Sequence, residues 1–386
     1  MRLLAELHRA FNRPLHVAYI DVKSAFDSVD RSALWKVLQA EGMPPSLLQL
    51  IRNLHTGTTA RVRTHNGLSA SFNTASGVRQ GCILAPDLFC SAIDWLMEML
   101  SHLCPDSFGI EVAGSHFTDM DYADDAVLLT SDPRNWGNVL GCYEDSASTV
   151  GLHTNWLKTK IQNIGAGLAP EMVSMYGQTV EPVVKFTYLG SDVDSEGYST
   201  PEIHRRLGMG NSIMGQLDAI WRQQKLSLQT KLRLYTSLVL SVVLYGSETW
   251  TLRKSDSDRL QSFHMTSQRR ILGIRWFEHV TNASIQETTG LMNLSLIIAD
   301  RRHDLFGHVC RLPPETPVRR ALQLCTDIFN GDRPTPEWKR PRGRPRRSWL
   351  QQIEEDFGAP ISVAYIAAQD RSSWRSLRPS AGLAHQ

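Results

Sequence analysis

The sequence predicts an α+β protein in which an antiparallel sheet packs on helices and a helical, basic region follows. Short apolar runs bounded by turn residues, at 17–20 and on both arms of 117–129, predict strands. Apolar residues at three-to-four spacing predict helices over 200–223, 228–240 and 255–272. The order of these segments, strands first and helices later, is typical of an α+β architecture.

The composition is that of a globular chain with a sizeable core. The 386 residues are 42% hydrophobic and 21% charged, which is enough for two domains. The chain begins MRLLAELHR, which is charged and amphipathic, unlike a signal peptide. The longest apolar run, 238–245, is far shorter than the roughly 20 residues that span a bilayer. We therefore expect a protein of the nucleus or cytoplasm, with reduced cysteines because the six show no paired spacing.

The first candidate site residue, Asp21, directly follows the predicted strand at 17–20. This run, VAYI, is short, aromatic and β-branched, as in a buried strand. Further along, Asp30 precedes a helical pattern that begins at Arg31, which is the position of an N-cap. Asp27 lies between the two, and the pattern leaves its role open between structure and catalysis.

Two further carboxylates, Asp124 and Asp125, lie on the turn of the predicted hairpin. Like charges so close raise each other's pKa, so keeping both ionised requires a cation, and oxygen ligands favour Mg²⁺. The alternative is that aspartate serves only as a turn residue here. Together with Asp21, this pair can hold two Mg²⁺ ions about 4 Å apart, the arrangement used for in-line nucleotidyl transfer. Mn²⁺ suits the same oxygen ligands.

A glycine-rich segment, SGVRQGCILAP, has the composition of a nucleotide contact. Gly77 and Gly81 flank Arg79 and Gln80, so that the backbone can approach a nucleotide while the two side chains offer donors. The alternative is an ordinary glycine turn. Pro86 then opens an apolar stretch that predicts a helix packed under the sheet.

Five blocks of the chain, in one order, resemble the reverse transcriptases of non-LTR, LINE-like retrotransposons. They lie at 18–27, 76–86, 122–125, 151–160 and 186–190, within a match that covers residues 10 to 250. A single short motif matches by chance, but five in consistent strand and helix contexts make a strong signal. The resemblance implies a polymerase-type palm over 1–195, a helical thumb over 196–275, a helical region over 276–332 and a basic tail over 333–386.

The resemblance also implies roles for individual residues. Metal binding is expected at Asp21, the backbone of Val22, Asp124 and Asp125, with two Mg²⁺ ions as cofactors. The nucleotide site is expected at Phe26, Arg79, Gln80 and Gly81. In the family a bulky side chain at the position of Phe26 excludes a ribose 2′-hydroxyl and so favours deoxynucleoside triphosphates. Taken alone, Phe26 is explained by packing.

Lys158 lies where the family has a lysine near the leaving pyrophosphate, as an electrostatic stabiliser or general acid. Lys160 is the competing candidate, and the alternative is a solvated lysine on a strand edge. Tyr188, Leu189 and Gly190 resemble the element that grips the primer end. The glycine there would let the backbone approach nucleic acid.

Positive charge is concentrated late in the chain, although the net charge is only +2. Residues 301–347 hold twelve Lys or Arg against five Asp or Glu, a local excess typical of nucleic-acid contacts. Within this region, KRPRGRPRR resembles the AT-hook, which lies extended in the minor groove of A·T-rich duplex DNA. DNA contacts are expected at Arg340, Arg342, Gly343, Arg344, Arg346 and Arg347. The alternative is a disordered basic linker or a nuclear-localisation run.

The chain departs from the family mainly at its start, where only 20 residues precede Asp21. We therefore expect the fingers to be largely missing, and no apurinic-type endonuclease domain is expected. The run VVLYGSETW at 242–250 is similar to these elements but has no assigned chemical role. The first hypothesis is an RNA-directed DNA polymerase core that uses an RNA template, a DNA primer and deoxynucleoside triphosphates. The second is a catalytically inactive retrotransposon-derived fragment that only binds nucleic acid.

Overall fold

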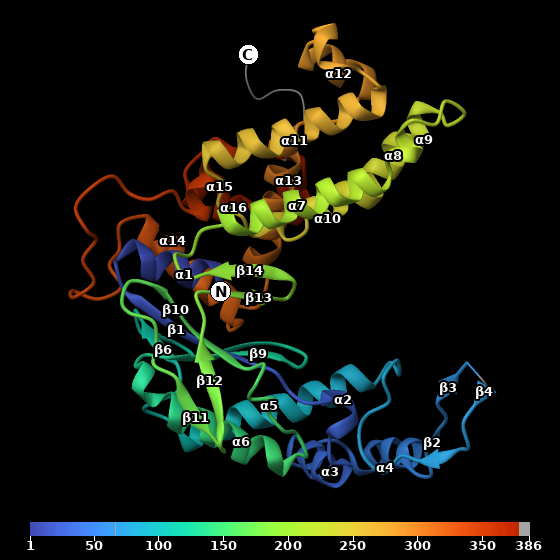
Figure 1. Cartoon of the computed structure of the whole chain (residues 1–386). Helices are drawn as coiled ribbons and strands as arrows, with labels where there is room; N and C mark the ends of the chain where they lie inside the picture. Colours follow the sequence, from blue (N-terminus) through green and yellow to red (C-terminus); the bar gives the residue numbers. More distant parts are fainter. Residues whose placement is uncertain (66, 378–386) are drawn as a thin grey trace. The chain divides into compact units, whose positions relative to one another are not determined.

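The computed structural model describes residues 1–65 and 67–377, which form two compact units (Figure 1). Pro14–Val184 contains the main sheet and is called the sheet unit below. Met1–Arg13 and the chain from Lys185 onward form the second, mostly helical unit, called the helical unit. The domain boundaries predicted at 195, 275 and 332 remain predictions.

The sheet unit is built on a six-stranded sheet with the strand order β11-β12-β10-β1-β9-β8. β1 lies in the interior of the sheet, antiparallel to β10 on one side and to β9 on the other, and its Leu15, Val17 and Ala18 are fully buried. The pair β10 and β12 is parallel. The strands are β1 (Pro14–Ile20), β8 (Asp119–Tyr122), β9 (Asp125–Thr130), β10 (Lys160–Gly165), β11 (Val173–Met175) and β12 (Gln178–Pro182).

Helices α3, α5 and α6 complete the core of the sheet unit. Ala18 and Leu128 of the central strands share one buried cluster with Leu34 of α3, Phe89 of α5 and Trp136 of α6. Each helix directs one apolar face at this cluster. The helices are α2 (Ala25–Ser28), α3 (Arg31–Ala40), α4 (Pro45–His55), α5 (Ala85–Leu103) and α6 (Trp136–Thr149), and the short strands are β2 (Thr59–Ala60), β3 (Arg63–Thr64), β4 (Gly67–Leu68), β5 (Phe72–Asn73), β6 (Ile110–Val112) and β7 (Ser115–Phe117).

The helical unit has its own core, to which Trp221, Tyr235, Trp250, Leu260 and Leu294 contribute. It begins with α1 (Arg2–Ala10) and resumes with the hairpin of β13 (Lys185–Tyr188) and β14 (Ser191–Asp194). Its other helices are α7 (Thr200–Gln216), α8 (Asp218–Trp221), α9 (Leu228–Leu234), α10 (Ser241–Val243), α11 (Lys254–Leu272), α12 (Asn282–Thr289), α13 (Leu294–Cys310), α14 (Pro317–Phe329), α15 (Trp349–Phe357), α16 (Ile361–Ala367) and α17 (Arg371–Ser376).

The predicted α+β class, with an antiparallel sheet on helices and a helical region after it, is confirmed. The strand at 17–20 lies in β1, the hairpin within 117–129 is β8 and β9, and the helix after Pro86 is α5. Asp30 is the N-cap of α3, where its side chain accepts a hydrogen bond from the Ala33 amide. Local sequence patterns therefore located these elements correctly.

Two predicted helices of the helical unit are interrupted. The helix predicted over 200–223 ends at Gln216, one residue after a glycine at 215 that weakens helical backbone, and resumes as α8 at Asp218. The helix predicted over 228–240 becomes a π-helix at Tyr235–Leu240.

Within residues 1–65 and 67–377, no helix combines the length and the apolar composition needed to cross a bilayer.

His264 on α11 is a fully buried histidine. The Tyr235 hydroxyl lies 2.9 Å from His264 Nδ1, and His264 Nε2 lies 3.1 Å from the Met292 carbonyl. A neutral ring protonated on Nε2 satisfies both contacts, since the hydroxyl then donates to Nδ1 and Nε2 donates to the carbonyl. Burial lowers the pKa of His264 to about 4.

The ordinary pKa of histidine is about 6.5, so between pH 6.5 and 4 the unfolded chain binds this proton more readily than the folded chain. We predict that the free energy of unfolding decreases as the pH falls through this window, by about 1–3 kcal/mol from His264 alone. His264→Gln should lack this part of the pH dependence in urea unfolding at pH 7 and pH 5. His308→Gln, at an exposed position of α13, is the control. The same pH dependence in both variants would contradict the assignment.

Candidate active site

The pairing of the central strands brings the first candidate carboxylate beside the hairpin. In the β1–β9 pair, Ile20 lies opposite Ala126. Asp21 directly follows Ile20 in the sequence, and Asp125 directly precedes Ala126. Because the two strands are antiparallel, these aspartates lie at the same edge of the sheet.

The second hairpin carboxylate lies on the turn itself. In the β8–β9 pair Tyr122 lies opposite Asp125, which leaves Ala123 and Asp124 as a two-residue turn. Ala123 has a φ of 54°, a left-handed conformation that non-glycine residues rarely adopt. Positive φ at the first central residue matches the twist of the flanking strands. The turn therefore holds Asp124 next to Asp125 at the cost of some strain at Ala123.

The charges of the three carboxylates act on one another. Partial burial raises the pKa of Asp125, and the negative charges of Asp124 and Asp21 raise it further. Oxygen ligands that carry excess negative charge favour a hard divalent cation. In the part of the chain that the structure describes, no three His, Cys, Asp or Glu side chains are grouped as a metal site. The backbone thus brings the carboxylates together, while their side chains do not form a closed ligand shell.

The segment before β10, which includes the fourth block, packs against the end of β1. The Asn155 amide donates to the Asp21 carbonyl at 2.7 Å, and the Asp21 amide donates to Thr159 Oγ1 at 3.3 Å. Lys158 lies between these two contacts in the sequence, with its Nζ 3.6 Å from Asp21 Oδ1. This pair is partly solvated, so it fixes the lysine only weakly.

The structure distinguishes the two candidate lysines. Lys158 lies in a turn instead of on a strand edge, and its side chain is exposed, as the alternative of a solvated lysine has it. Lys160 is on β10, and its Nζ forms an ion pair with Glu181 at 2.9 Å. Of the two, Lys158 is therefore the lysine whose charge lies near Asp21.

Gly77 of the second block makes a close approach to the chain's own backbone. The Gly77 amide donates to the Val29 carbonyl and the Val78 amide donates to the Phe26 carbonyl, each at 2.8 Å. A Cβ at Gly77 would lie 2.7 Å from the Asp27 Cα, and the φ of Gly77 is +78°. Gly81 also has a positive φ, of +86°, but open space around its Cβ position. The first glycine therefore joins two blocks, and only the second leaves room for a ligand.

Arg31 holds this part of the sheet unit together and was not identified from the sequence. Its Nε donates to the Gly77 carbonyl at 2.8 Å, and its Nη1 donates to the His55 and Thr74 carbonyls at 2.9 Å each. A signal was present, because an arginine in the first turn of a helix is disfavoured by the helix dipole. Such a residue needs a compensating role.

The predicted nucleotide-site residues lie in the same unit, with different degrees of exposure. Phe26 is half-buried and stacks on Phe89, with ring centroids 4.6 Å apart. Arg79 and Gln80 are exposed. Val22 is buried and forms an isolated β-bridge with Thr154. Phe26 therefore packs against Phe89, in agreement with the alternative interpretation from the sequence. This packing is compatible with a contact between Phe26 and a nucleotide.

The basic segment, defined here as Lys339–Arg347, belongs to the helical unit and is anchored at both ends. The Arg340 guanidinium lies over the ring of Phe11, the residue that directly follows α1, 5.2 Å from its centroid. At the other end, Arg347 forms an ion pair with Glu355 of α15. Between the anchors, residues 341–345 are exposed and follow no regular helix or strand. The segment is thus a loop tied to the helical unit at both ends.

A pocket of about 380 Å³ lies between this loop and the helices α1, α14 and α15. Leu7 of α1, Phe11 directly after that helix, and Ile328 of α14 supply apolar walls. The arginines that line it are Arg9, Arg340, Arg342, Arg344 and Arg346. The pocket is therefore lined by apolar side chains of the helices and by five arginines, four of which lie on the loop.

Residues 4–193 match the family described as reverse transcriptase (RNA-dependent DNA polymerase). A transposon-derived protein of Caenorhabditis elegans is 26% identical over 284 residues, which are 69% of this chain and 96% of that protein. The RNA-directed DNA polymerase from the mobile element jockey of Drosophila melanogaster is 24% identical, over 70% of this chain and 31% of its own length. A Pol polyprotein from a type-2 retrotransposable element of the same fly is 28% identical, over 66% of this chain and 24% of its own length.

Residues 4–193 are thus a reverse transcriptase domain. With these relatives, it is a reverse transcriptase of the non-LTR, LINE-like kind, as the five blocks indicated. The chain spans under a third of the two Drosophila proteins. A solved telomerase from Candida albicans, in complex with a fragment of telomeric RNA, is 12% identical over 84% of this chain and 51% of its own, with a TM-score of 0.38.

We predict that Gly77→Ala lowers the free energy of unfolding of the sheet unit by more than about 2 kcal/mol, because its Cβ would collide with backbone that cannot rotate away. Gly81→Ala is the matched control, with a similar positive φ and no collision, and should cost about 1 kcal/mol. Urea unfolding followed by tryptophan fluorescence measures both. Equal losses would show that the contact with residues 26–29 is unimportant.

Proposed function

We propose that this chain is the core of an RNA-directed DNA polymerase that works by two-metal-ion nucleotidyl transfer. The observation that carries the proposal is the strand register that puts Asp21 and Asp125 at one edge of the sheet, next to Asp124. Carboxylates on neighbouring strands are the arrangement that a pair of divalent ions needs for in-line phosphoryl chemistry. The match of residues 4–193 to the reverse transcriptase family agrees with it.

The donor atoms suit Mg²⁺, and Mn²⁺ as a substitute. The three carboxylates offer only oxygen. Partial burial and the charges of Asp124 and Asp21 raise the pKa of Asp125, and bound cations would stabilise its ionised form. We place the backbone carbonyl of Val22 in the same ligand set. When bound, the two ions would supply an activated primer 3′-hydroxyl and charge stabilisation of the triphosphate.

The chain's own residues would bind and orient the substrates. Arg79 and Gln80 are exposed beside Gly81 and would donate to the incoming deoxynucleoside triphosphate. Phe26, fixed against Phe89, would limit space at the 2′ position of the sugar. Lys158 would stabilise the leaving pyrophosphate, since its charge already faces Asp21.

The substrates that we assign are an RNA template and a DNA primer. The name of the jockey relative, an RNA-directed DNA polymerase, supports a chain that reads RNA. The second hypothesis, a catalytically inactive nucleic-acid-binding fragment, uses the same basic surfaces without the chemistry. It is an outcome of the test below.

We predict that the purified chain extends oligo(dT) on poly(rA) with Mg²⁺ and dTTP. Asp124→Asn combined with Asp125→Asn should lower incorporation by more than about 100-fold, because both carboxylates stabilise charge that develops in the transition state. Asp106→Asn, at an exposed turn of the same unit, is the control and should keep full activity.

Undiminished incorporation by the double variant would reveal a contaminating polymerase or a wrong site. Absence of incorporation by the unmodified chain, together with retained binding of the duplex, would favour the inactive nucleic-acid-binding fragment.

We further propose that the basic segment binds A·T-rich duplex DNA. Both of its ends are anchored, and the centre, which includes Arg342, Gly343 and Arg344, is exposed with a φ of +126° at the glycine. An exposed Arg-Gly-Arg centre can enter a narrow minor groove, where the negative potential attracts arginine. Arg340, Arg346 and Arg347 would add contacts to phosphates.

We predict that Arg342→Ala combined with Arg344→Ala lowers the affinity for A·T-rich duplex DNA by about tenfold or more, and the affinity for G·C-rich duplex much less. Fluorescence anisotropy at fixed salt measures both. Arg371→Ala combined with Arg375→Ala, at exposed positions of α17, removes the same charge elsewhere and is the control. Equal affinity of the unmodified chain for the two duplexes would instead favour the linker or nuclear-localisation role.

A further inference from the structure

The turn that resembles a primer grip has an unusual backbone conformation. Tyr188 pairs with Ser191 in the β13–β14 hairpin, so Leu189 and Gly190 are its two central residues. Their φ angles are 48° and 73°. Positive φ at both central positions favours Asn-Gly, and a leucine there is strained. Something outside the hairpin must therefore stabilise this turn.

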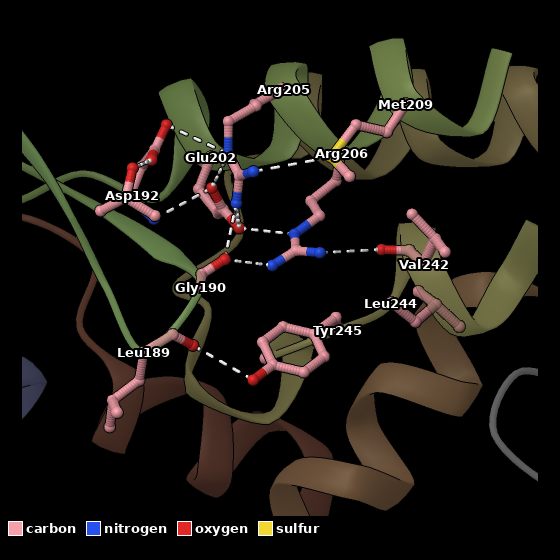
Figure 2. A network of polar contacts seen from close by, with 12 residues as sticks. Leu189, Gly190, Asp192, Glu202, Arg205, Arg206, Met209, Val242, Leu244 and Tyr245 are labelled. Carbon is pink, nitrogen blue, oxygen red and sulfur yellow. Dashed lines mark hydrogen bonds and ion pairs between the residues drawn. The ribbon is translucent and has the colours of Figure 1, made fainter. Parts of the chain in front are cut away.

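Three side chains from later helices and their connections hold the two carbonyls of the turn (Figure 2). The Tyr245 hydroxyl donates to the Leu189 carbonyl at 3.1 Å. Arg205 Nη2 donates to the Gly190 carbonyl at 2.7 Å, and Arg206 Nη2 donates to the same oxygen. No donor of the hairpin itself takes part in these three bonds.

The two arginines are themselves fixed by buried carboxylates. Glu202 accepts from Arg205 Nε and Nη2, at 2.8 Å each, and from Arg206 Nε at 2.7 Å. Glu202 also accepts a hydrogen bond from the Asp192 amide, at 3.0 Å, which connects the network to β14. Glu202 and Asp192 are 1% and 3% exposed. Buried carboxylates with this many donors keep low pKa values and fixed positions.

Tyr245 is placed by the second arginine. The Arg206 guanidinium lies over the Tyr245 ring, 4.5 Å from its centroid, and its Nη1 donates to the Val242 carbonyl at 3.4 Å. Tyr245 and Val242 belong to the run VVLYGSETW, which had no role from the sequence. These contacts give the run a structural role, because it positions the Tyr245 hydroxyl against the turn.

The orientation of the carbonyls sets the direction of the amides. Across a trans peptide bond, the N–H points opposite to the C=O. Holding the Leu189 carbonyl against Tyr245 therefore turns the Gly190 N–H away from the helices. The five charged groups around the turn, Lys185, Arg205 and Arg206 with Asp192 and Glu202, carry one excess positive charge. An outward amide and a positive balance are suited to a phosphate oxygen.

We propose that Tyr245, Arg205 and Arg206 are positioning residues that hold the Tyr188–Gly190 turn in the conformation in which its backbone meets the phosphates of the primer strand. The proposal rests on the proposed polymerase function. It also makes a claim about the turn that is independent of catalysis, because the three donors restrain the backbone with or without nucleic acid.

The test is Tyr245→Phe, which keeps the ring under Arg206 and removes only the hydroxyl. Primer extension on poly(rA)/oligo(dT) should show a KM for the duplex raised by about three- to tenfold, with the KM for dTTP unchanged. Amide hydrogen exchange at residues 189–191 should become faster in the free protein. Tyr365→Phe, on α16 of the same unit, is the matched control and should change neither.

The readouts separate the possible failures. An unchanged duplex KM together with unchanged exchange in Tyr245→Phe would overturn the proposal, and so would an equal rise in the KM for dTTP. If the unmodified chain does not extend primers, the polymerase function fails. The duplex affinity by fluorescence anisotropy, with the exchange rates, then decides the positioning role alone, and equal values in the unmodified chain and the variant would overturn it.

Discussion

The antiparallel pairing of β1 with β9 is the interaction on which the candidate active site depends. Both strands are buried, so their register is fixed by the core, and a slip of one residue would turn every side chain to the opposite face. The same register fixes the spacing of Asp21 and Asp125. β10, on the other side of β1, follows the turn that carries Lys158. The geometry of the candidate site and the stability of the fold therefore depend on the same strand pairing.

Glycines join the blocks of the site to one another. Gly77 lies against the backbone of Phe26 and Asp27, and Gly151, at the start of the fourth block, would place a Cβ 2.7 Å from the Asp30 amide. Both have positive φ, so each is required for conformation as well as for space. Three sequence blocks meet through main-chain contacts at residues 26–30, and few side chains are needed to align them.

Local patterns were enough to predict the strand at 17–20, the hairpin with Asp124 and Asp125, the cap at Asp30 and the helix after Pro86. Each depends on residues a few positions apart. The hydrogen bonds of the Arg31 and Tyr245 side chains were not predictable. They reach main-chain carbonyls up to 46 and 56 residues away in the sequence, and every residue has such a carbonyl, so the sequence does not mark the acceptor. The choice between the two lysines likewise required the position of Glu181.

The anchoring of the basic segment ties the two ends of the sequence together. The ring of Phe11, directly after α1, lies under Arg340, and an edge contact from Trp338 to His8 of α1 adds a second attachment. A loop restrained in this way loses little conformational entropy when it meets a rigid partner, so more of its contact energy appears as affinity. Helix α1 near the amino terminus thus supports the basic segment, which lies more than three hundred positions later in the sequence.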